Sequence, residues 1–310
     1  MIHYYKTIEG VVRPIDSAEK DCWVAVEHPT PEEITFLIET LGVDAGFINS
    51  SLDEEETSRV EKEENQTLII VDMPVMEEKT NAEAALYYTM PIGFVVCKEY
   101  VLTISLRESS ILKDIAAGRI KGINTAFKTH FLLTVLLRIA SRYVQYLRQI
   151  DKIALATEKQ LHQSMKNKEL IQLLNLEKSL VYFSTALKST EVTLEKIFRG
   201  RIIKLYEEDE ELLEDALIEI KQAIETCNIY AGILSGTMDA FASVISNNLN
   251  IVMKVLTSIT IVMAIPNIVF GFYGMNVDLP LPHVLAPIGI TLLLCGGTAF
   301  LLYRKGYFRA

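Results

Sequence analysis

The sequence predicts an α+β membrane protein with an α/β cytoplasmic domain, a layer of long helices, a stalk helix and two membrane spans. Three observations predict this class. Residues 255–277 and 284–303 carry no formal charge, and each is long enough to cross a hydrocarbon core of roughly 30 Å as a helix. Residues 1–122 alternate short apolar runs with turn residues. The segment between these parts almost lacks proline and glycine.

Charge separates the front of the chain from its end. The whole chain has a net charge of −10 and a mean hydropathy of +0.24. Residues 251–310 hold one acid and four bases, which leaves 39 acids against 26 bases, or −13, in residues 1–250. Nucleic acid is therefore excluded as a partner, because its phosphates need a basic surface. The acidity suits attraction of cations and equally suits simple solubility.

The spans have a predicted orientation. Lys254 precedes the first span and three bases follow the second, whereas the connecting loop 278–283 has none. By the positive-inside rule, both termini are cytoplasmic and residues 304–310 form a basic cytoplasmic tail. The chain opens without the pattern of a signal peptide, so we expect a multi-pass protein of the cell membrane with the loop outside.

The sequence lacks the motifs of several enzyme classes. The cysteines are solitary, which predicts reduced thiols at Cys22, Cys97, Cys227 and Cys295. No HExxH pattern and no Walker motif is present. We therefore expect no catalytic residues and no enzyme.

The elements follow in order. Strands are predicted at 22–26, 68–71, 87–97 and 100–105. Thr30 as N-cap and Pro31 at the first position predict a helix over 31–41. Long antiparallel helices are expected within 123–206, at 125–164 and 169–199, with a break at 166–168. The stalk helix, 207–254, has no stop signal before the first span, so it continues to Tyr273 over roughly 100 Å.

A stripe of small and polar residues runs along this helix. Two rows with a spacing of seven lie next to each other on one face: Asp239, Ser246, Met253, Thr260, Asn267 and Gly274, and Gly236, Ser243, Asn250, Thr257, Ala264 and Gly271. Such a stripe in lipid serves either close helix packing or a wet passage. Its hydrogen-bonding groups at every level favour a pore. One hairpin cannot enclose a pore, so several copies must surround a common axis.

At the end of the first span stands the sequence Y-G-M-N, Tyr273 to Asn276, preceded by M-K-V-L-T at 253–257. These motifs resemble the CorA family of magnesium channels. Trp23-Val24 followed by P-T-P-E-E-I, and the segment 52–61, which is similar to an acidic helix of the family, extend the resemblance over nearly the whole chain.

The resemblance implies a homopentamer that conducts Mg²⁺ and is gated by cytosolic Mg²⁺. Gly274, Met275 and Asn276 would form the selectivity filter, where a ring of neutral oxygens receives the hydrated ion. Gly274 and Asn276 also suit a helix C-cap and turn. The implied pore positions are Ser246, Asn250, Met253, Leu256, Thr260, Ala264 and Asn267, with Met253 and Leu256 as a hydrophobic constriction. Pro266-Asn267 departs from the Pro-Thr of many members, so a bulkier amide replaces the hydroxyl as the acceptor of this second ring.

The resemblance also implies carboxylates that sense Mg²⁺ between subunits. The acidic run 207–215 supplies candidates in Glu211 and Asp215, and Asp239 ends the stripe. A solvated acidic helix face explains the run equally well. On the front domain, the expected aspartate is replaced near Ser50, with acids at 53–56 close by.

Two other functions stay open. The nearest alternative is a transporter of the same fold for zinc, cobalt or nickel. Met275 and the absence of Cys and His from the stripe favour magnesium over these ions. A membrane-tethered scaffold that conducts nothing is the alternative from another class, and ion flux into liposomes distinguishes it.

Overall fold

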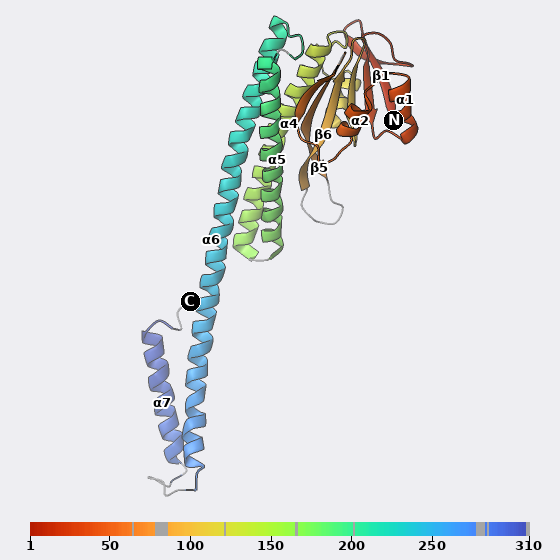
Figure 1. The fold of residues 1–310 in the computed structure, drawn as a ribbon. Helices are drawn as coiled ribbons and strands as arrows, with labels where there is room; N and C mark the ends of the chain where they lie inside the picture. Colours follow the sequence, from red (N-terminus) through yellow and green to blue (C-terminus); the bar gives the residue numbers. More distant parts are fainter. Residues whose placement is uncertain are drawn as a thin grey trace. The chain divides into compact units, whose positions relative to one another are not determined.

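The computed structural model describes residues 1–63, 65–77, 86–120, 122–164, 167–200, 202–276, 283 and 285–307. The chain divides into two compact units, Met1–Ser235 and Gly236–Ala310, and helix α6 contributes to both. Figure 1 shows the sheet and the long helices of the first unit and the helix pair of the second.

The first unit contains a seven-stranded sheet with the order β2-β1-β3-β7-β6-β5-β4. All neighbours pair antiparallel except β3 and β7, which are parallel. The strands are β1 (Ile2–Ile8), β2 (Val11–Ile15), β3 (Trp23–Glu27), β4 (Arg59–Glu63), β5 (Gln66–Glu77), β6 (Leu86–Val96) and β7 (Val101–Ser105). The four predicted strands are confirmed as β3, β5, β6 and β7, and the sequence reasoning missed β1, β2 and β4.

Each face of the sheet has its own apolar core. One core joins alternate strand residues to the short helices, as with Val24, Leu68 and Leu102 against Leu37 and Phe47. The helices of this side are α1 (Pro31–Glu39) and α2 (Ala45–Ser51). The approach is close, because a Cβ on Gly93 of β6 would lie 1.9 Å from Ser51 Oγ of α2. Glycine is therefore required at this position.

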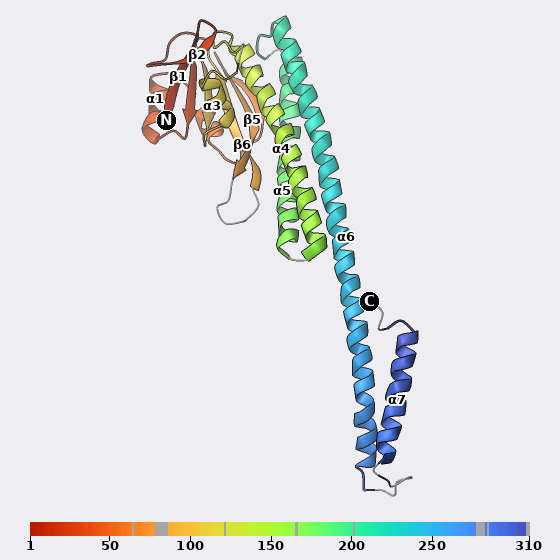
Figure 2. The same cartoon turned by 180° about the vertical axis from the view of Figure 1, so that it is seen from behind.

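The opposite face packs against long helices, as Figure 2 shows from behind. Trp23 of β3 stacks on Tyr5 with ring centroids 4.8 Å apart and lies 5.3 Å from the ring of Phe131. Phe131 belongs to α4 (Lys128–Ser164), which packs with α5 (Asn167–Gly200). The short helix α3 (Ser110–Ala116) precedes them. Of the predicted break at 166–168, Lys166 is outside the described residues, and the prediction is wrong for Asn167 and Lys168, which form the start of α5.

Local signals placed α1 correctly. Thr30 Oγ1 accepts from Glu33 N, and Glu33 in return accepts from Thr30 N at 2.8 Å, so the helix begins with a full capping box. The short helices α2 and α3 were missed, although the side chains of Asp44 and Ser109 cap them by accepting from Phe47 N and Leu112 N.

The prediction of an acidic helix over 52–61 is wrong. Helix α2 ends at Ser51, Asp53 accepts from Glu55 N at 3.0 Å in a turn, and β4 begins at Arg59. Val60 pairs with Ile69 in the neighbouring strand and is buried. Pairing with β5 therefore outweighs the helical preference of the glutamates.

The stalk helix is confirmed as α6 (Glu207–Tyr273), one helix of 67 residues that continues through Pro266. Within the first unit, its inward row is Leu213, Ala216, Ile220, Ala223 and Cys227, a spacing of three and four that buries one face. Cys227 Sγ lies 2.9 Å from the carbonyl oxygen of Leu180 in α5. This contact joins α5 and α6.

In the second unit, α7 (Leu285–Arg304) lies antiparallel beside the end of α6 (Figure 1). Both helices are long and apolar enough to cross a membrane, each with a window of mean hydropathy 2.0. They match the predicted spans 255–277 and 284–303, whose ends Val277 and Val284 are outside the described residues.

Candidate functional site

The predicted stripe lies on an exposed face of α6. Within the stripe, Met253 is 51% exposed and Ala264 is half-buried; Leu256, a pore position implied by the family, lies beside the stripe and is 55% exposed. The polar members are exposed as well: Asp239, Ser246, Asn250, Thr260 and Asn267. The Thr260 hydroxyl donates to the carbonyl oxygen of Leu256 at 2.9 Å. The hydroxyl hydrogen of Thr260 is therefore already donated, and the oxygen remains available as an acceptor. The water molecules around a cation turn their hydrogens outward, so they need acceptors of this kind.

Helix α7 covers the opposite face of α6. Ser258 and Val269 of α6 are buried there, together with Thr291 of α7. Cys295 Sγ lies 3.6 Å from the carbonyl oxygen of Val262. At 3.6 residues per turn, the row through Val262 and Val269 lies about 150° around the helix from the stripe. Within this unit, α7 therefore leaves the stripe uncovered.

The Gly274-Met275-Asn276 motif follows directly on the last turn of α6. Gly274 N donates to the Phe270 carbonyl at 2.9 Å, Met275 N donates to that of Phe272 at 3.3 Å, and Asn276 is exposed. A Cβ on Gly274 would lie 3.2 Å from the Phe270 oxygen. Gly274 has no positive φ, so it serves close packing on the helix end and not a left-handed cap. The predicted loop 278–283 lies outside the described residues except for His283.

The acidic start of α6 contains two kinds of carboxylate. Asp209 is 3% exposed, accepts from Tyr206 N at 3.1 Å, and lies 3.3 Å from His130 Nδ1. It anchors the first turn of α6 to α4. Glu211 and Asp215 are exposed to solvent. In the described residues, no group of three or more His, Cys, Asp and Glu could hold a metal, so Glu211, Asp215 and Asp239 stay predicted ligands.

An arginine occupies the place where the front domain was expected to offer an aspartate. Arg59 Nη2 donates to Ser50 Oγ at 3.1 Å, and the guanidinium forms ion pairs with Glu56 and Glu61. Hydrogen bonding to Glu56 raises the pKa of Arg59 above its usual value. Of the acids at 53–56, Glu56 is therefore already engaged in an ion pair with Arg59. Sequence reasoning missed Arg59, because nothing in its local sequence marks it as a partner of Ser50.

The comparisons with known proteins bear on nearly the whole chain. The model of the family described as CorA-like Mg2+ transporter protein matches residues 19–304. The chain belongs to the CorA family. Members of the CorA family are transporters and channels, so this chain is not an enzyme, and the resemblance read from Tyr273 to Asn276 is confirmed.

Two curated CorA proteins are similar to this chain. The cobalt/magnesium transport protein CorA of Methanocaldococcus jannaschii is 28% identical over 281 residues, covering 88% of this chain and 84% of the relative. The protein of the same name from Thermotoga maritima is 22% identical over 301 residues, 93% of this chain and 84% of the relative.

The fold is also that of a solved CorA structure. The complete structure of the CorA magnesium transporter from Methanocaldococcus jannaschii superposes with a TM-score of 0.81 at 23% identity, covering 100% of this chain and 98% of that one. The predicted fold class is thereby confirmed. Two candidate spans together with CorA membership make this a multi-pass membrane protein that transports divalent cations.

Proposed function

We propose that this CorA protein is a passive magnesium channel that admits Mg²⁺ to the cytosol. The observation that carries the proposal is the exposed face of α6 that α7 leaves free and that ends at Gly274, Met275 and Asn276. Neutral amide and carbonyl oxygens suit an ion that gives up its water shell reluctantly. A ring of such oxygens holds the hydrated ion weakly enough for it to leave again.

Several copies must surround the pathway, and the family supports a homopentamer in the cell membrane. With the stripe inward and α7 outward, Asn276, Asn267, Thr260 and Asn250 would each form a ring of oxygens. Met253 and Leu256 would form an apolar constriction between these rings, where a pore closes by losing its water. With both termini cytoplasmic, the membrane potential drives uptake, since each charge crossing 100 mV gains about 2.3 kcal/mol.

Cytosolic Mg²⁺ is proposed to hold the channel closed through carboxylates that face a neighbouring copy. Exposed Asp215 and Glu211 on α6 are the candidates, with Asp239 nearer the stripe. Like charges from adjacent subunits repel, and a bound dication offsets that repulsion. Release of the ion would loosen the helices and open the pore.

Cobalt is a second candidate cargo, because the relatives are named cobalt/magnesium transport proteins. Zinc and nickel are less suited, since the described part of the stripe offers amide, hydroxyl and carboxylate oxygen but no imidazole or thiolate.

The test is ion flux into liposomes that contain the purified full-length protein. We expect Mg²⁺ influx that Asn276→Ala abolishes and that Asn248→Ala, an exposed amide on the opposite face of α6, leaves intact. Competition by Co²⁺, Ni²⁺ and Zn²⁺ in the same assay orders the cargo ions. Absence of flux for every ion would favour the scaffold, and normal flux through Asn276→Ala would remove the proposed filter.

A further inference from the structure

Helix α5 carries a row of exposed apolar side chains. The members of the row have between 38% and 67% of their surface exposed: Ile171, Leu174, Val181 and Val192. At 3.6 residues per turn they lie within about 80° of one another, on the side of α5 opposite the buried Phe183 and Leu187. A contiguous apolar row, unlike single exposed residues, marks a surface that contacts another molecule. Helix α5 is not one of the two candidate membrane helices, so lipid tails do not explain the row.

The charges on this face of α5 are all positive. Lys178, Lys196 and Arg199 lie in the same sector of the helix, Lys188 borders it, and no acid of α5 falls within it. Arg199 pairs with Glu195 at 3.4 Å. Within the residues that the structure describes, the three lysines form no ion pair. The outer face of α5 is therefore apolar and basic.

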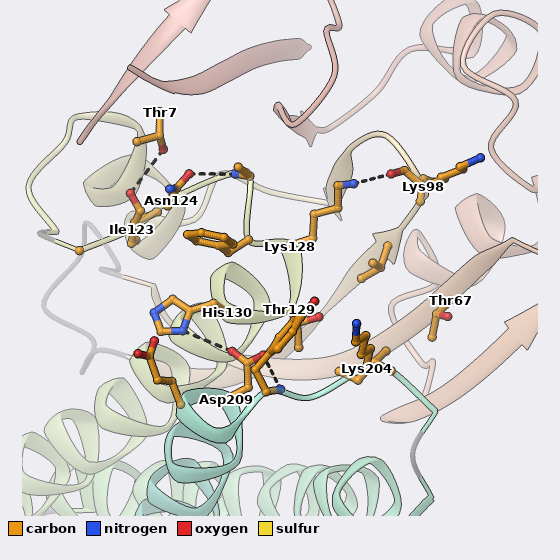
Figure 3. Close-up of a pocket in the computed structure, with 18 of the residues that line it drawn as sticks. Thr7, Thr67, Lys98, Ile123, Asn124, Lys128, Thr129, His130, Lys204 and Asp209 are labelled. Atoms are coloured by element: carbon orange, nitrogen blue, oxygen red, sulfur yellow. Dashed lines mark hydrogen bonds and ion pairs between the residues drawn. The ribbon is translucent and has the colours of Figure 1, made fainter. Parts of the chain in front are cut away.

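Helix α6 has an exposed face of the opposite charge in the same unit. Its start is held to α4, because Asp209 Oδ1 lies 3.3 Å from His130 Nδ1 (Figure 3), and Asp209 belongs to the buried side of the helix. On the opposite side, more than half of the surface of Ile218, Ile229 and Ile233 is exposed. Four exposed acids share that side and form no ion pair among the described residues: Glu211, Glu214, Asp215 and Glu225. The outer face of α6 is therefore apolar and acidic.

The two outer faces do not meet within one chain, because α6 packs on α5 through other residues. Three contacts join the two helices: Leu180 with Cys227, Ser184 with Asn228, and Glu191 with Lys221. The numbering rises along α5 as it falls along α6, so the helices are antiparallel. These contacts place Val181 at the same height along the helices as Ile229, and Val192 at the same height as Ile218. One turn beyond Val192, Lys196 is level with Glu214.

A closed ring of copies uses a different surface on each side of every copy, and the two surfaces must complement each other. Rotation about an axis along the helices keeps every residue at its height. Residues that are level within one chain are therefore level between neighbouring copies as well. With the outer face of α5 against the outer face of α6 of the next copy, Val192 would meet Ile218 and Val181 would meet Ile229. Lys196 would then lie beside Glu214.

We propose that the outer face of α5 docks on the outer face of α6 of the next copy. The contacts between valine and isoleucine remove apolar surface from water, and the pairing of basic with acidic side chains sets the orientation. Glu211 and Asp215 stay available to the proposed regulatory Mg²⁺. This inference rests on the proposed ring of copies around α6, and it does not depend on ion conduction.

Disulfide formation between copies of the full-length protein in detergent tests the contact. Val192→Cys combined with Ile218→Cys should give a ladder of covalent oligomers, up to the pentamer, on a non-reducing denaturing gel after mild oxidation. The bond forms only where the two Cβ atoms come within about 4 Å. The matched control combines Val192→Cys with Ile229→Cys and should give no ladder, because Ile229 is roughly 16 Å out of level with Val192. A bond within one chain would leave a monomer on the gel.

Charge tests the same contact without a covalent bond. Val192→Glu and Val192→Lys both place a charge at an exposed position, but only the glutamate variant is repelled by the acids of α6. We expect Val192→Glu to raise the concentration at which the pentamer dissociates by about ten-fold or more, and Val192→Lys to raise it much less. Lys196→Glu should weaken the pentamer, and combining it with Glu214→Lys should restore it. Lys20→Glu, an exposed lysine outside α5, should have no effect.

The outcomes separate this contact from the proposed channel. A wild-type pentamer whose 192–218 cysteine pair gives no ladder, or gives the same ladder as the 192–229 pair, would overturn the contact and leave the channel standing. Equal dissociation of Val192→Glu and Val192→Lys would also overturn it. A monomeric wild type would overturn both the contact and the pore.

Discussion

At the scale of single residues, buried polar groups show what the cytoplasmic domain requires. The Trp23 indole N–H donates to Thr103 Oγ1 at 2.9 Å, and both side chains are fully buried. Ser58 Oγ donates to Asp72 Oδ2 at 3.1 Å and also contacts Thr190 of α5. These bonds join β3 to β7 and the sheet to α5, so each is expected to affect stability.

Thr103→Val tests the first bond. Valine has nearly the same shape but leaves the buried indole donor without a partner, which costs about 1–3 kcal/mol. Denaturant unfolding of the purified protein measures the loss. Thr185→Val, an exposed threonine on α5, should change stability by no more than about 0.5 kcal/mol. Equal losses in both variants would contradict the role of the bond.

The buried carboxyl of Asp72 predicts how the stability of the folded protein depends on pH. Burial raises the pKa of its carboxyl above 3.8, and the hydrogen bond from Ser58 only partly opposes this. The folded state then keeps a proton that the unfolded state has lost, so stability falls as pH rises from about 4 through the raised pKa. Asp72→Asn lacks this titration. Thermal unfolding between about pH 4 and pH 7 should show the variant gaining stability relative to the wild type, and a constant difference would contradict the assignment.

At the scale of elements, local sequence signals predicted α1 and the long helices, whereas the short helices α2 and α3 were missed. Thr30 and Pro31 start α1, and α6 covers 207–273 as expected because its sequence offers no stop. The helix expected over 52–61 came from the family resemblance and not from a local signal. Pairing of β4 with β5 makes a strand from Arg59 onward, and that partner lies further along the chain.

The stripe of α6 yields an element-scale prediction. Thr260→Val keeps the shape of the side chain and removes its outward acceptor, so we expect Mg²⁺ flux in liposomes to fall several-fold. Thr237→Val, off the stripe on the same helix, should conduct as the wild type does. Equal flux in the two variants would indicate that the stripe is a packing surface.

At the scale of the whole molecule, assembly decides whether the stripe encloses a pore. A single chain exposes Asn250, Thr260 and Asn267, and its described residues bring together no group of three or more His, Cys, Asp or Glu that could hold a metal. Both features are explained if further copies complete the site. Native mass spectrometry of the detergent-solubilised protein should give five subunits, and a monomer would contradict the proposed pore.

Regulation by cytosolic Mg²⁺ is also a property of the whole assembly. Asp215→Asn removes charge that a bound Mg²⁺ would offset between copies, so flux should persist when liposomes contain high Mg²⁺ on the cytoplasmic side. Glu219→Gln, another acid on α6, serves as the matched control. Closure of both variants at the same Mg²⁺ concentration would place the sensor elsewhere.

The sequence by itself determined the two spans, the single helix from 207 to 273, the stripe and the Gly274-Met275-Asn276 motif. These depend on composition and spacing along one segment, which the chain carries locally. Only the tertiary structure decided that α7 packs opposite the stripe and that Arg59 occupies the place next to Ser50. Such contacts join residues far apart in sequence, and their partners are selected by packing and pairing of whole elements, which no local pattern records.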